Sequence, residues 1–497
     1  MALVKVCGIE TEYGVLVISA GDMSPTTASS LLINSYVSRL ERKIGWDFED
    51  ESPQRDARGF AREGAMPPEV ETHLVNAVLT NGARYYVDHA HPEYSTPECS
   101  NPLQLVCHDR AGEVILARSM EAARRLLPPG EEIVVHKNNS DGKGNSYGCH
   151  ENYLIDRQVP FARIVQRLTP HLVTRQLFCG AGKVGQENVG DSDAPVEFQI
   201  SQRADFFEEE VGLETTLKRP IINTRDEPHA DPQKYRRLHV IVGDANLAEV
   251  STFLKAGTTA MVLAMIEDDF DNGRDLRLAS PVAAIRAISK DPQLSTVVQL
   301  ESGERLTAVE LQWELHGLAR KYCEEQGFDF IGGDVVGSMV LERWEHVLQG
   351  LETEPESLAS EIDWIAKRRL VEGYRDRHGL SARDPKLSAL DLQYHDLRPE
   401  KSLFARLDME RLVDPEEVET AVTEPPQTTR AYFRGRCLQL FAQAIVAANW
   451  DSVVFDIGQD PLRRVPMMEP LRGTAQHVDA LFDHCTSPAE LLTRLGS

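Results

Sequence analysis

The sequence predicts an α+β fold in which a mixed, mainly antiparallel β-sheet is packed by helices. Most of the expected strands are short and separated by turn residues, a pattern typical of sheets whose neighbouring strands run in opposite directions. From about residue 280 to 410 the pattern is instead mainly helical. The chain has 497 residues, 41% apolar and 26% charged, which is enough for one large domain with a smaller partner.

The elements follow from the hydrophobic pattern along the chain. The first predicted strand covers residues 2–18, with a turn around Gly14, and a helix follows near 28–44. Further strands are expected in five short runs: 82–89, 132–138, 146–156, 195–202 and 236–243. A helix at 248–267 carries apolar residues such as Phe253, Leu254 and Met261 and is expected to pack on the sheet.

Residues 45–74 are rich in charge, proline and glycine and show little periodicity. This composition predicts a long, mobile surface loop. Loops longer than about 12–15 residues without structure of their own are uncommon and often functional. A passive insertion is the alternative interpretation.

The C-terminal part of the chain is predicted to form a separate small domain. Residues 413–430 are acidic and contain prolines, which favours a linker. We therefore divide the chain into a catalytic domain over 1–425 and a small α+β domain over 426–497. The small domain is expected to contain a helix at 431–448, a strand at 451–456 and a final helix.

Charge and cysteine usage exclude several classes of function. The chain has 78 acidic and 53 basic residues, a net charge of −25, which argues against nucleic acid or an anionic membrane as partner. None of the eight cysteines forms a CxxC pair, so a zinc cluster is not expected. The sequence shows no signal peptide and no apolar run of about 20 residues, so we expect a cytoplasmic protein with free thiols.

The candidate site is a set of polar residues at alternate strand positions. Residues i and i+2 of a strand share a face. The pairs or triplets that project together in this way are Glu10 with Glu12, Arg84 with Tyr86 and Asp88, His150 with Asn152, and Arg237 with His239. Glu93 and Glu98 follow a His-Pro turn. A solvated strand face explains any one of these patterns alone.

Convergence of these residues in a cleft predicts a metal site. Several carboxylates brought together repel one another unless cations neutralise them. Oxygen-rich clusters select hard cations, which favours magnesium or manganese over zinc. Arginines beside the metal would clamp phosphate oxygens. The GAGKVG segment at 180–185 lacks the full phosphate-loop pattern and is interpreted as a flexible turn.

Four segments carry a family resemblance: GIETEYG at 8–14, ARYYVDHAHPEYSTPEC at 83–99, SYGCHENYL at 146–154 and RRLHVIVGDAN at 236–246. Together they resemble the Pup ligase/depupylase family of actinobacteria, within the carboxylate–amine ligase superfamily that includes glutamine synthetase. The resemblance extends from Gly8 to the NWDSVVFD segment at 449–456. It implies a glutamine synthetase-like large domain whose curved, mainly antiparallel sheet is packed by helices.

The resemblance also implies a role for each matching residue. Asp88 matches the catalytic aspartate. The metal ligands are expected to be Glu10, Glu12, Tyr86, Glu93, His150 and His239, the last at a strand position where glutamine synthetases have a glutamate. The residues expected to bind the nucleotide are Arg84, Thr96, Asn152, Arg225, Arg237 and Trp450, and Trp450 has a role as an interdomain anchor as its alternative. The implied cofactors are ATP, or ADP with phosphate, and Mg²⁺.

Two branches of the family differ in the direction of the reaction. The ligase joins the C-terminal glutamate of Pup to a substrate lysine with ATP consumption. The depupylase cuts that isopeptide bond and deamidates a C-terminal glutamine of Pup to glutamate. The loop at 45–74 and the HAHPEY sequence after Asp88 resemble the depupylase branch. Two further hypotheses are a non-catalytic Pup-binding protein and a small-molecule ligase.

The expected partners are Pup and pupylated proteins, and we expect a monomer. Pup in this family is small, disordered and acidic, so a chain of net charge −25 requires a local basic track to bind it. The candidates for that track are Arg203, Lys218, Arg219, Arg430, Arg434 and Arg436. The sequence leaves open whether Asp88 attacks the amide carbon or activates a water.

Overall fold

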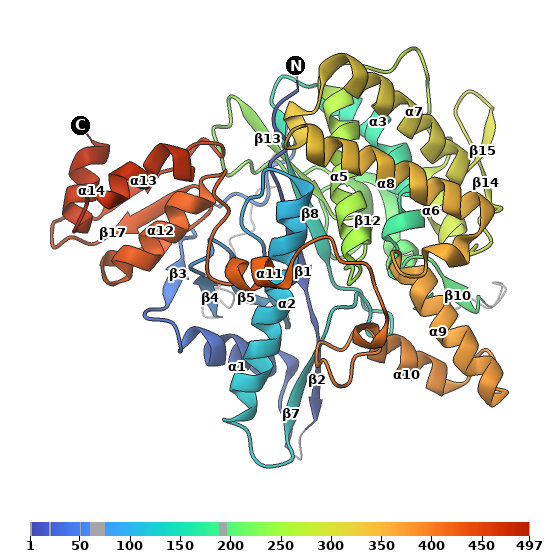
Figure 1. Cartoon of the computed structure of the whole chain (residues 1–497), viewed down its shortest axis with the longest axis horizontal. Coiled ribbons are helices and arrows are strands. Elements are labelled where there is room, and N and C mark those ends of the chain that lie inside the picture. The colour runs from blue at the N-terminus through green and yellow to red at the C-terminus, as the bar shows by residue number, and fades with distance from the viewer. Residues whose placement is uncertain (1, 19–20, 50, 60–74, 188–195, 497) are drawn as a thin grey trace.

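The computed structural model describes residues 2–18, 21–49, 51–59, 75–187 and 196–496, and it is organised around a ten-stranded sheet (Figure 1). From one edge to the other, the strands are β13 (Tyr235–Val240), β8 (Cys149–Asp156), β1 (Cys7–Glu12), β6 (His91–Ser95), β5 (Arg84–Asp88), β4 (Asn76–Val78), β3 (Ile44–Trp46), β16 (Ile445–Ala448), β17 (Ser452–Phe455) and β18 (Arg463–Pro466). All neighbouring pairs in this sheet are antiparallel except β3 with β16. The expected α+β fold class is confirmed.

One face of the sheet is covered by three helices and is apolar. Side chains at odd positions of β1, such as Ile9 and Thr11, are buried on this face together with Tyr85 and Tyr94. The covering helices are α1 (Pro25–Val37), α2 (Pro102–Arg124) and α5 (Glu249–Glu267). Because strand side chains alternate, burying this face directs Glu10 and Glu12 to the opposite one.

Local sequence explains where the first two helices begin. The Ser24 hydroxyl accepts a hydrogen bond from the Thr27 N–H at 3.2 Å, and Pro25 occupies the first position of α1. The Asn101 side chain accepts from the Gln104 N–H at 2.9 Å, and a proline again follows the cap. Both are favoured N-terminal signals, since the cap satisfies a free N–H and proline has none to satisfy.

Helix α5 is enclosed by the rest of the molecule, and nearly all of its residues are buried. Its length and composition match those of a membrane-spanning helix, but its apolar window is entirely buried inside the molecule. It contacts α3 (Phe161–Thr174), α7 (Ala308–Gln326) and α8 (Asp334–Thr353) in addition to the sheet. It is therefore the central helix of the main core.

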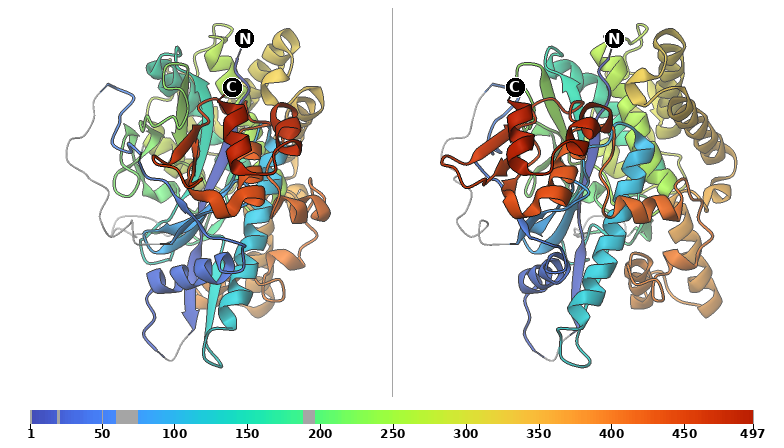
Figure 2. Two further views of the ribbon diagram at one scale, coloured as in Figure 1. Left: turned by 90° about the vertical axis from the view of Figure 1, so that its left-hand side faces the viewer. Right: turned by 60° about the vertical axis from the view of Figure 1, so that its left-hand side comes forward.

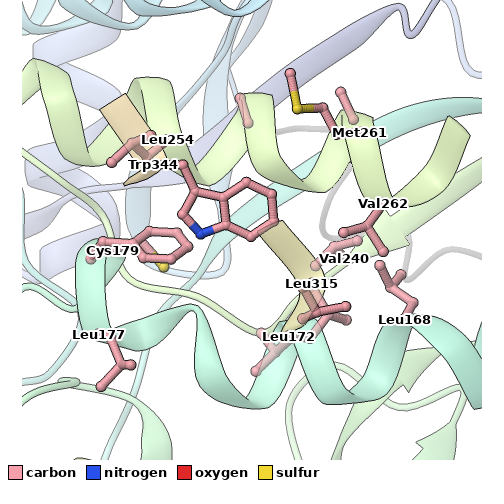
Figure 3. Close-up of a cluster of buried hydrophobic side chains, with 14 of the residues drawn as sticks. Leu168, Leu172, Leu177, Cys179, Val240, Leu254, Met261, Val262, Leu315 and Trp344 are labelled. Atoms are coloured by element: carbon pink, nitrogen blue, oxygen red, sulfur yellow. The ribbon is translucent and has the colours of Figure 1, made fainter. Parts of the chain in front are cut away.

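Trp344 lies at the centre of this helical layer (Figure 3). Its side chain is fully buried, and leucines such as Leu172 and Leu315 surround the ring. The indole N–H donates to the Gln312 Oε1 at 3.1 Å, so the one polar atom of the ring has a partner. Burial of a large ring with its N–H satisfied stabilises the contact between α7 and α8.

The remaining elements surround these layers. The helices are α4 (Gln176–Cys179), α6 (Pro281–Ser289), α9 (Asp363–His378), α10 (Pro385–Tyr394), α11 (Pro415–Ala421), α12 (Ala431–Phe441), α13 (Ala475–Asp483) and α14 (Pro488–Leu495). The strands outside the main sheet are β2 (Gly14–Ile18), β7 (Glu132–His136), β9 (Lys183–Val184), β10 (Phe198–Gln199), β11 (Phe207–Gly212), β12 (Arg219–Asn223), β14 (Val297–Gln299) and β15 (Arg305–Thr307).

Several sequence predictions are corrected by the fold. The helix expected at 28–44 is α1, which ends at Val37, and the strand expected at 195–202 is reduced to β10. The residues expected as a His-Pro turn are the start of strand β6, where Pro92 lies opposite Val87; proline is tolerated at the beginning of a strand. The predicted helix at 431–448 ends at Phe441 and continues as β16. Sequence reasoning did not predict α2.

The loop expected at 45–74 is ordered in its described first part. Its first residues belong to β3, and Asp56 accepts hydrogen bonds from Thr224 at 2.8 Å and from Arg58. Asp56 also forms an isolated β-bridge with Arg225. This stretch therefore packs against the segment that follows β12. Residue 50 and residues 60–74 lie outside the described part of the chain.

The segment expected as a linker at 413–430 contains a packed helix. Helix α11 lies on α2, and Val418, Ala421 and Val422 are buried. Further on, β16 pairs in parallel with β3, so the C-terminal strands extend the main sheet. Figure 2 shows the C-terminal helices grouped on one flank of the sheet. The division into 1–425 and 426–497 stays a prediction.

We expect Trp344→Ala to lower the free energy of unfolding by about 3–5 kcal/mol, because it leaves a cavity in the main core. Val335→Ala is the matched control, since Val335 lies in the same helix and is 81% exposed. Urea denaturation of both variants measures the difference. Equal effects of the two substitutions would contradict the central role given to this layer.

Candidate active site

The strand register brings the predicted site residues to one face of the sheet. Glu12 lies directly opposite Glu93, and Glu93 lies opposite Tyr86. On the other side, Glu10 lies opposite His150, and Asn152 lies opposite His239. Directly opposed residues share a face, so five neighbouring strands contribute to one polar surface.

A first group of possible metal ligands consists of Glu10, His150 and His239, whose ligand atoms lie within 4.8 Å of one another. The Asn152 amide donates to the Glu10 Oε1 at 2.8 Å, and the Arg237 guanidinium donates to the Asn152 Oδ1 at 2.6 Å. Burial alone raises the pKa of Glu10. The hydrogen bond with His150 and the positive charge of Arg237 oppose burial, so the pKa of Glu10 lies well below its usual value.

His239 is poised to coordinate a cation. Its Nε2 is buried without a hydrogen-bond partner among the described residues. Burial lowers the pKa of His239 well below its usual value, although the Glu10 carboxylate opposes that shift. The ring is therefore neutral, which is the form that binds metals.

A second group consists of Glu12, Asp88 and Glu93, again with oxygens within 4.8 Å of one another. Glu93 is buried, its Oε1 accepts a hydrogen bond from the Tyr86 hydroxyl, and its Oε2 has no partner among the described residues. Burial and the neighbouring carboxylates of Asp88 and Glu12 raise the pKa of Glu93 well above its usual value. An oxygen-binding cation would satisfy the orphaned oxygen and relieve the repulsion, so these residues fit Mg²⁺.

The backbone approaches both groups closely at Gly148. A Cβ at this position would lie 2.4 Å from the His150 Nε2 and 2.7 Å from the Glu12 Oε1. Only glycine therefore leaves these two side chains in place. Sequence reasoning also missed His91, whose Nδ1 lies 3.4 Å from the Glu12 Oε2 and whose ring stacks on Tyr147 at 4.4 Å.

Asp88 ends β5 at the open side of the second group. Its carboxylate lies 3.2 Å from the His89 Nδ1, and its side chain is one-third exposed. Burial raises the pKa of Asp88, but His89, His150 and Arg84 outweigh it, and the pKa lies below its usual value. The residue is therefore an ionised carboxylate that a substrate in the cleft can reach.

A pocket adjoins the first group, and Glu10 belongs to its lining. Its lining includes Thr96, Asn152 and Arg237 from the sheet and Trp450 from the C-terminal segment. The Thr96 hydroxyl accepts a hydrogen bond from the Ile9 N–H at 3.0 Å, so it ties two strands together. The pocket thus lies between the sheet and the C-terminal segment.

Arg84 and Arg225 lie beside this pocket, outside its lining. The Arg84 guanidinium lies over the rings of Trp46, at 4.0 Å, and Tyr86, at 3.9 Å. Burial lowers the pKa of Arg237, and the positive charge of Arg225 lowers it further, so Arg225 is near Arg237. Together the three arginines give the cleft a positive side next to its carboxylates.

The proposed basic track for Pup is corrected by burial. Arg203, Arg430 and Arg434 are buried, and only Lys218 among the six candidates is exposed. Arg430 and Arg434 both bind the Glu98 carboxylate, with Arg430 Nε donating at 2.7 Å. They therefore hold the C-terminal segment to the sheet.

Arg203 and Arg219 form a second positive site at the Glu12 end of the cleft. Arg203 donates to the Ile241 carbonyl at 2.6 Å, and both arginines bind Ser146, Arg219 through the Ser146 carbonyl at 2.8 Å. Within the described residues, neither guanidinium has a carboxylate within 4 Å. Burial and the charge of Arg203 lower the pKa of Arg219 to about 10. The pair suits an anionic group of a ligand.

Comparisons with known proteins agree with this geometry. Residues 5–454 match the family of the Pup-ligase protein. A depupylase from Acidothermus cellulolyticus is 55% identical over 99% of both chains, and a Pup deamidase/depupylase from Mycolicibacterium smegmatis is 49% identical over 99% of both chains. Pup–protein ligase 1 from Rhodococcus erythropolis is 43% identical over 82% of this chain and 90% of the relative.

Two solved structures share the fold. The complex between the prokaryotic ubiquitin-like protein Pup and its ligase PafA matches with a TM-score of 0.81 and 35% identity, over 99% of this chain and 94% of that one. PafA in complex with ADP matches with a TM-score of 0.76 and 37% identity, over 88% of this chain and 99% of that one. The fold is thus that of a glutamine synthetase-like enzyme. Within that class, the chain belongs to the Pup-ligase family, as its motifs predicted.

The ion pairs of Glu98 with Arg430 and Arg434 should make the free energy of unfolding depend on pH. Burial raises the pKa of Glu98, but Arg434 and Arg430 outweigh burial and hold it at about 2. A carboxylate with a depressed pKa stabilises the fold above its unfolded value and loses this contribution as the pH falls towards the folded value. We expect Glu98→Gln to lower the free energy of unfolding by about 3 kcal/mol at pH 7.

The difference between wild type and Glu98→Gln should then shrink as the pH falls from 4.5 towards 2. Chemical denaturation at a series of pH values measures it. Glu121→Gln is the control, since Glu121 pairs with Arg125 on the exposed surface of α2. A difference that stays constant down to pH 3.5 would show that Glu98 is not held ionised by the two arginines.

Proposed function

We propose that the chain is a depupylase and Pup deamidase. It hydrolyses the isopeptide bond between the C-terminal glutamate of Pup and a substrate lysine, and it converts a C-terminal glutamine of Pup to glutamate. The observation that carries the proposal is the ionised Asp88 beside the carboxylates Glu12 and Glu93, in a chain whose full-length relatives bear depupylase names. The relatives named ligase are less identical to this chain.

We further propose that the cleft binds Mg²⁺ and a nucleotide. Glu10, His150 and His239 would hold one cation, and Glu12 and Glu93 with the Tyr86 hydroxyl nearby would hold another. Bound there, magnesium would neutralise the carboxylates and polarise the carbonyl oxygen of the scissile amide. The pocket beside Thr96 and Trp450 would take the nucleotide base, and a related ligase has been solved with ADP.

Asp88 has two roles open to it in the hydrolysis. As a nucleophile, its carboxylate attacks the amide carbon, the C–N bond breaks, and the leaving amine takes up a proton. The mixed anhydride on Asp88 is then hydrolysed by water. As a general base, Asp88 takes a proton from a water that attacks the same carbon. His89, at 3.2 Å, holds the carboxylate in place in both cases.

The nucleotide in this scheme is a cofactor. Amide hydrolysis in water runs downhill, so it does not require ATP cleavage for every bond broken. Forming an amide from a carboxylate does require it. The ratio of ADP released to bonds changed therefore separates the hydrolase from the Pup–protein ligase, which is the alternative function.

Further expectations concern the partners of the enzyme, its location and its oligomeric state. We propose Pup and pupylated proteins as its partners, since the relatives carry those names and a related ligase is seen with Pup. Nucleic acid and membranes are not proposed as partners, given the net charge of −25. Cytoplasmic location and a monomeric state stay predictions.

We expect Asp88→Asn to abolish cleavage, with a loss of at least about 10³-fold, because the amide neither attacks nor accepts a proton. Nucleotide binding should change little, since Asp88 lies outside the pocket lining. A gel assay with a Pup-conjugated protein measures cleavage, and calorimetry measures ADP binding. Asp22→Asn, at an exposed position, is the control. Cleavage by Asp88→Asn near the wild-type rate would refute the assignment.

The same gel assay with ATP, a non-hydrolysable analogue or no nucleotide tests the direction of the reaction. We expect cleavage that requires a nucleotide and proceeds with far fewer ADP molecules than bonds broken. Transfer of Pup to a lysine with one ADP per bond would establish the ligase instead.

Removal of magnesium with a chelator should stop cleavage while the protein stays folded, because both ligand groups lie in an open cleft and the core lies on the other face of the sheet. Circular dichroism checks the fold, and added Mg²⁺ should restore activity. Full activity in excess chelator would exclude a metal-dependent reaction.

A further inference from the structure

Trp46 lies between two residues that belong to the proposed nucleotide site. It is the last residue of β3 and is buried. One face of its ring lies 4.0 Å from the Arg84 guanidinium carbon, and its ring centroid lies 5.2 Å from that of Trp450 in an edge-to-face arrangement. Its indole N–H donates to the Glu51 Oε1 at 2.6 Å. Three contacts therefore fix the plane of the ring.

Arg84 is held by rings instead of by carboxylates. Its guanidinium lies between Trp46 and Tyr86, and its Nε donates to the Asn76 Oδ1 at 3.0 Å. Among the described residues, no carboxylate lies within 4 Å of it, and its two terminal nitrogens make no hydrogen bond. A guanidinium stacked in this way keeps its positive charge and its free N–H groups for an anion.

The sheet register places the Arg84 side chain on the face of the sheet that carries the cleft. Arg84 lies opposite Ser95, and Ser95 lies opposite Glu10 and lines the pocket. Arg84 therefore lies in the same cross-strand row as Glu10, a proposed metal ligand. Its strand is the neighbour of the strand whose Ser95 lines the pocket. An unrestrained arginine loses side-chain entropy when it binds a phosphate, and a stacked one loses less.

We infer that Trp46 is a positioning residue for nucleotide binding, which acts by holding Arg84 towards the phosphates. The inference rests on the proposed function, because it takes Arg84 as a nucleotide contact. A purely structural role competes with it, since Trp46 also belongs to the apolar cluster that includes Ile44, Val78 and Phe433. The two roles differ in their effect on nucleotide affinity.

A double-mutant cycle on Mg-ADP binding tests the inference. We expect Trp46→Ala to weaken ADP binding about 5- to 30-fold, the range of a partly buried cation–π contact. Trp46→Phe keeps an aromatic face and should weaken binding less than about 3-fold. In the Arg84→Ala background, Trp46→Ala should change the affinity by less than about 2-fold, because its effect passes through Arg84.

Turnover provides a second readout. At saturating nucleotide, Trp46→Ala should recover most of the wild-type kcat, so that the defect appears in the nucleotide KM. Trp344→Phe is the control for general destabilisation, since Trp344 is fully buried in the core and away from the pocket lining. It should leave the ADP affinity unchanged.

Three results would overturn the inference. Trp46→Ala with unchanged affinity would leave only the structural role. An equal effect of Trp46→Ala with and without Arg84 would show that Trp46 acts by another route. Unchanged affinity in Arg84→Ala would show that Arg84 is no nucleotide contact. None of these results would refute the proposed function, because cleavage of a Pup conjugate by the wild type and by Asp88→Asn tests it independently.

Discussion

Glu12 and Glu93 face each other directly across β1 and β6, and the rest of the site is arranged around that pair. Like charges at opposed strand positions destabilise a sheet, and here Asp88 adds a third carboxylate. Burial and the neighbouring carboxylates raise the pKa of Glu93 well above its usual value. The apolar core on the other face of the sheet holds the register against this repulsion.

The apolar face of the sheet fixes that register. A shift of one residue in β1 would turn Glu10 and Glu12 into the core beneath α2 and expose Ile9 and Thr11. The same alternation in β5 and β8 places Asp88 and His150 beside the two glutamates. The helices that cover the apolar face, α1, α2 and α5, thus determine where the carboxylates lie.

The C-terminal segment completes the cleft through buried charge pairs. Glu98, at the end of the motif that carries Asp88 and Glu93, binds Arg430 and Arg434. These bonds bring Trp450 to the pocket, where it meets Trp46 from the other end of the chain. The pocket wall, the arginine beside it and the carboxylates are therefore one connected unit, although they come from segments hundreds of residues apart.

The sequence by itself determined which face of each strand is polar. Alternation is a local property, so Glu10 with Glu12 and Arg84 with Asp88 were found correctly, as was helix α5. The family was also readable from its motifs. Tertiary structure alone decided what these faces meet, because register, burial and charge pairing depend on residues distant in the chain. Hence His91 and Gly148 were missed, strand β6 was mistaken for a turn at Pro92, and Arg203, Arg430 and Arg434 were placed on a surface track although they are buried. An arginine has the same local pattern on a surface as in a buried ion pair, and only the fold supplies the carboxylate, ring or carbonyl that holds it.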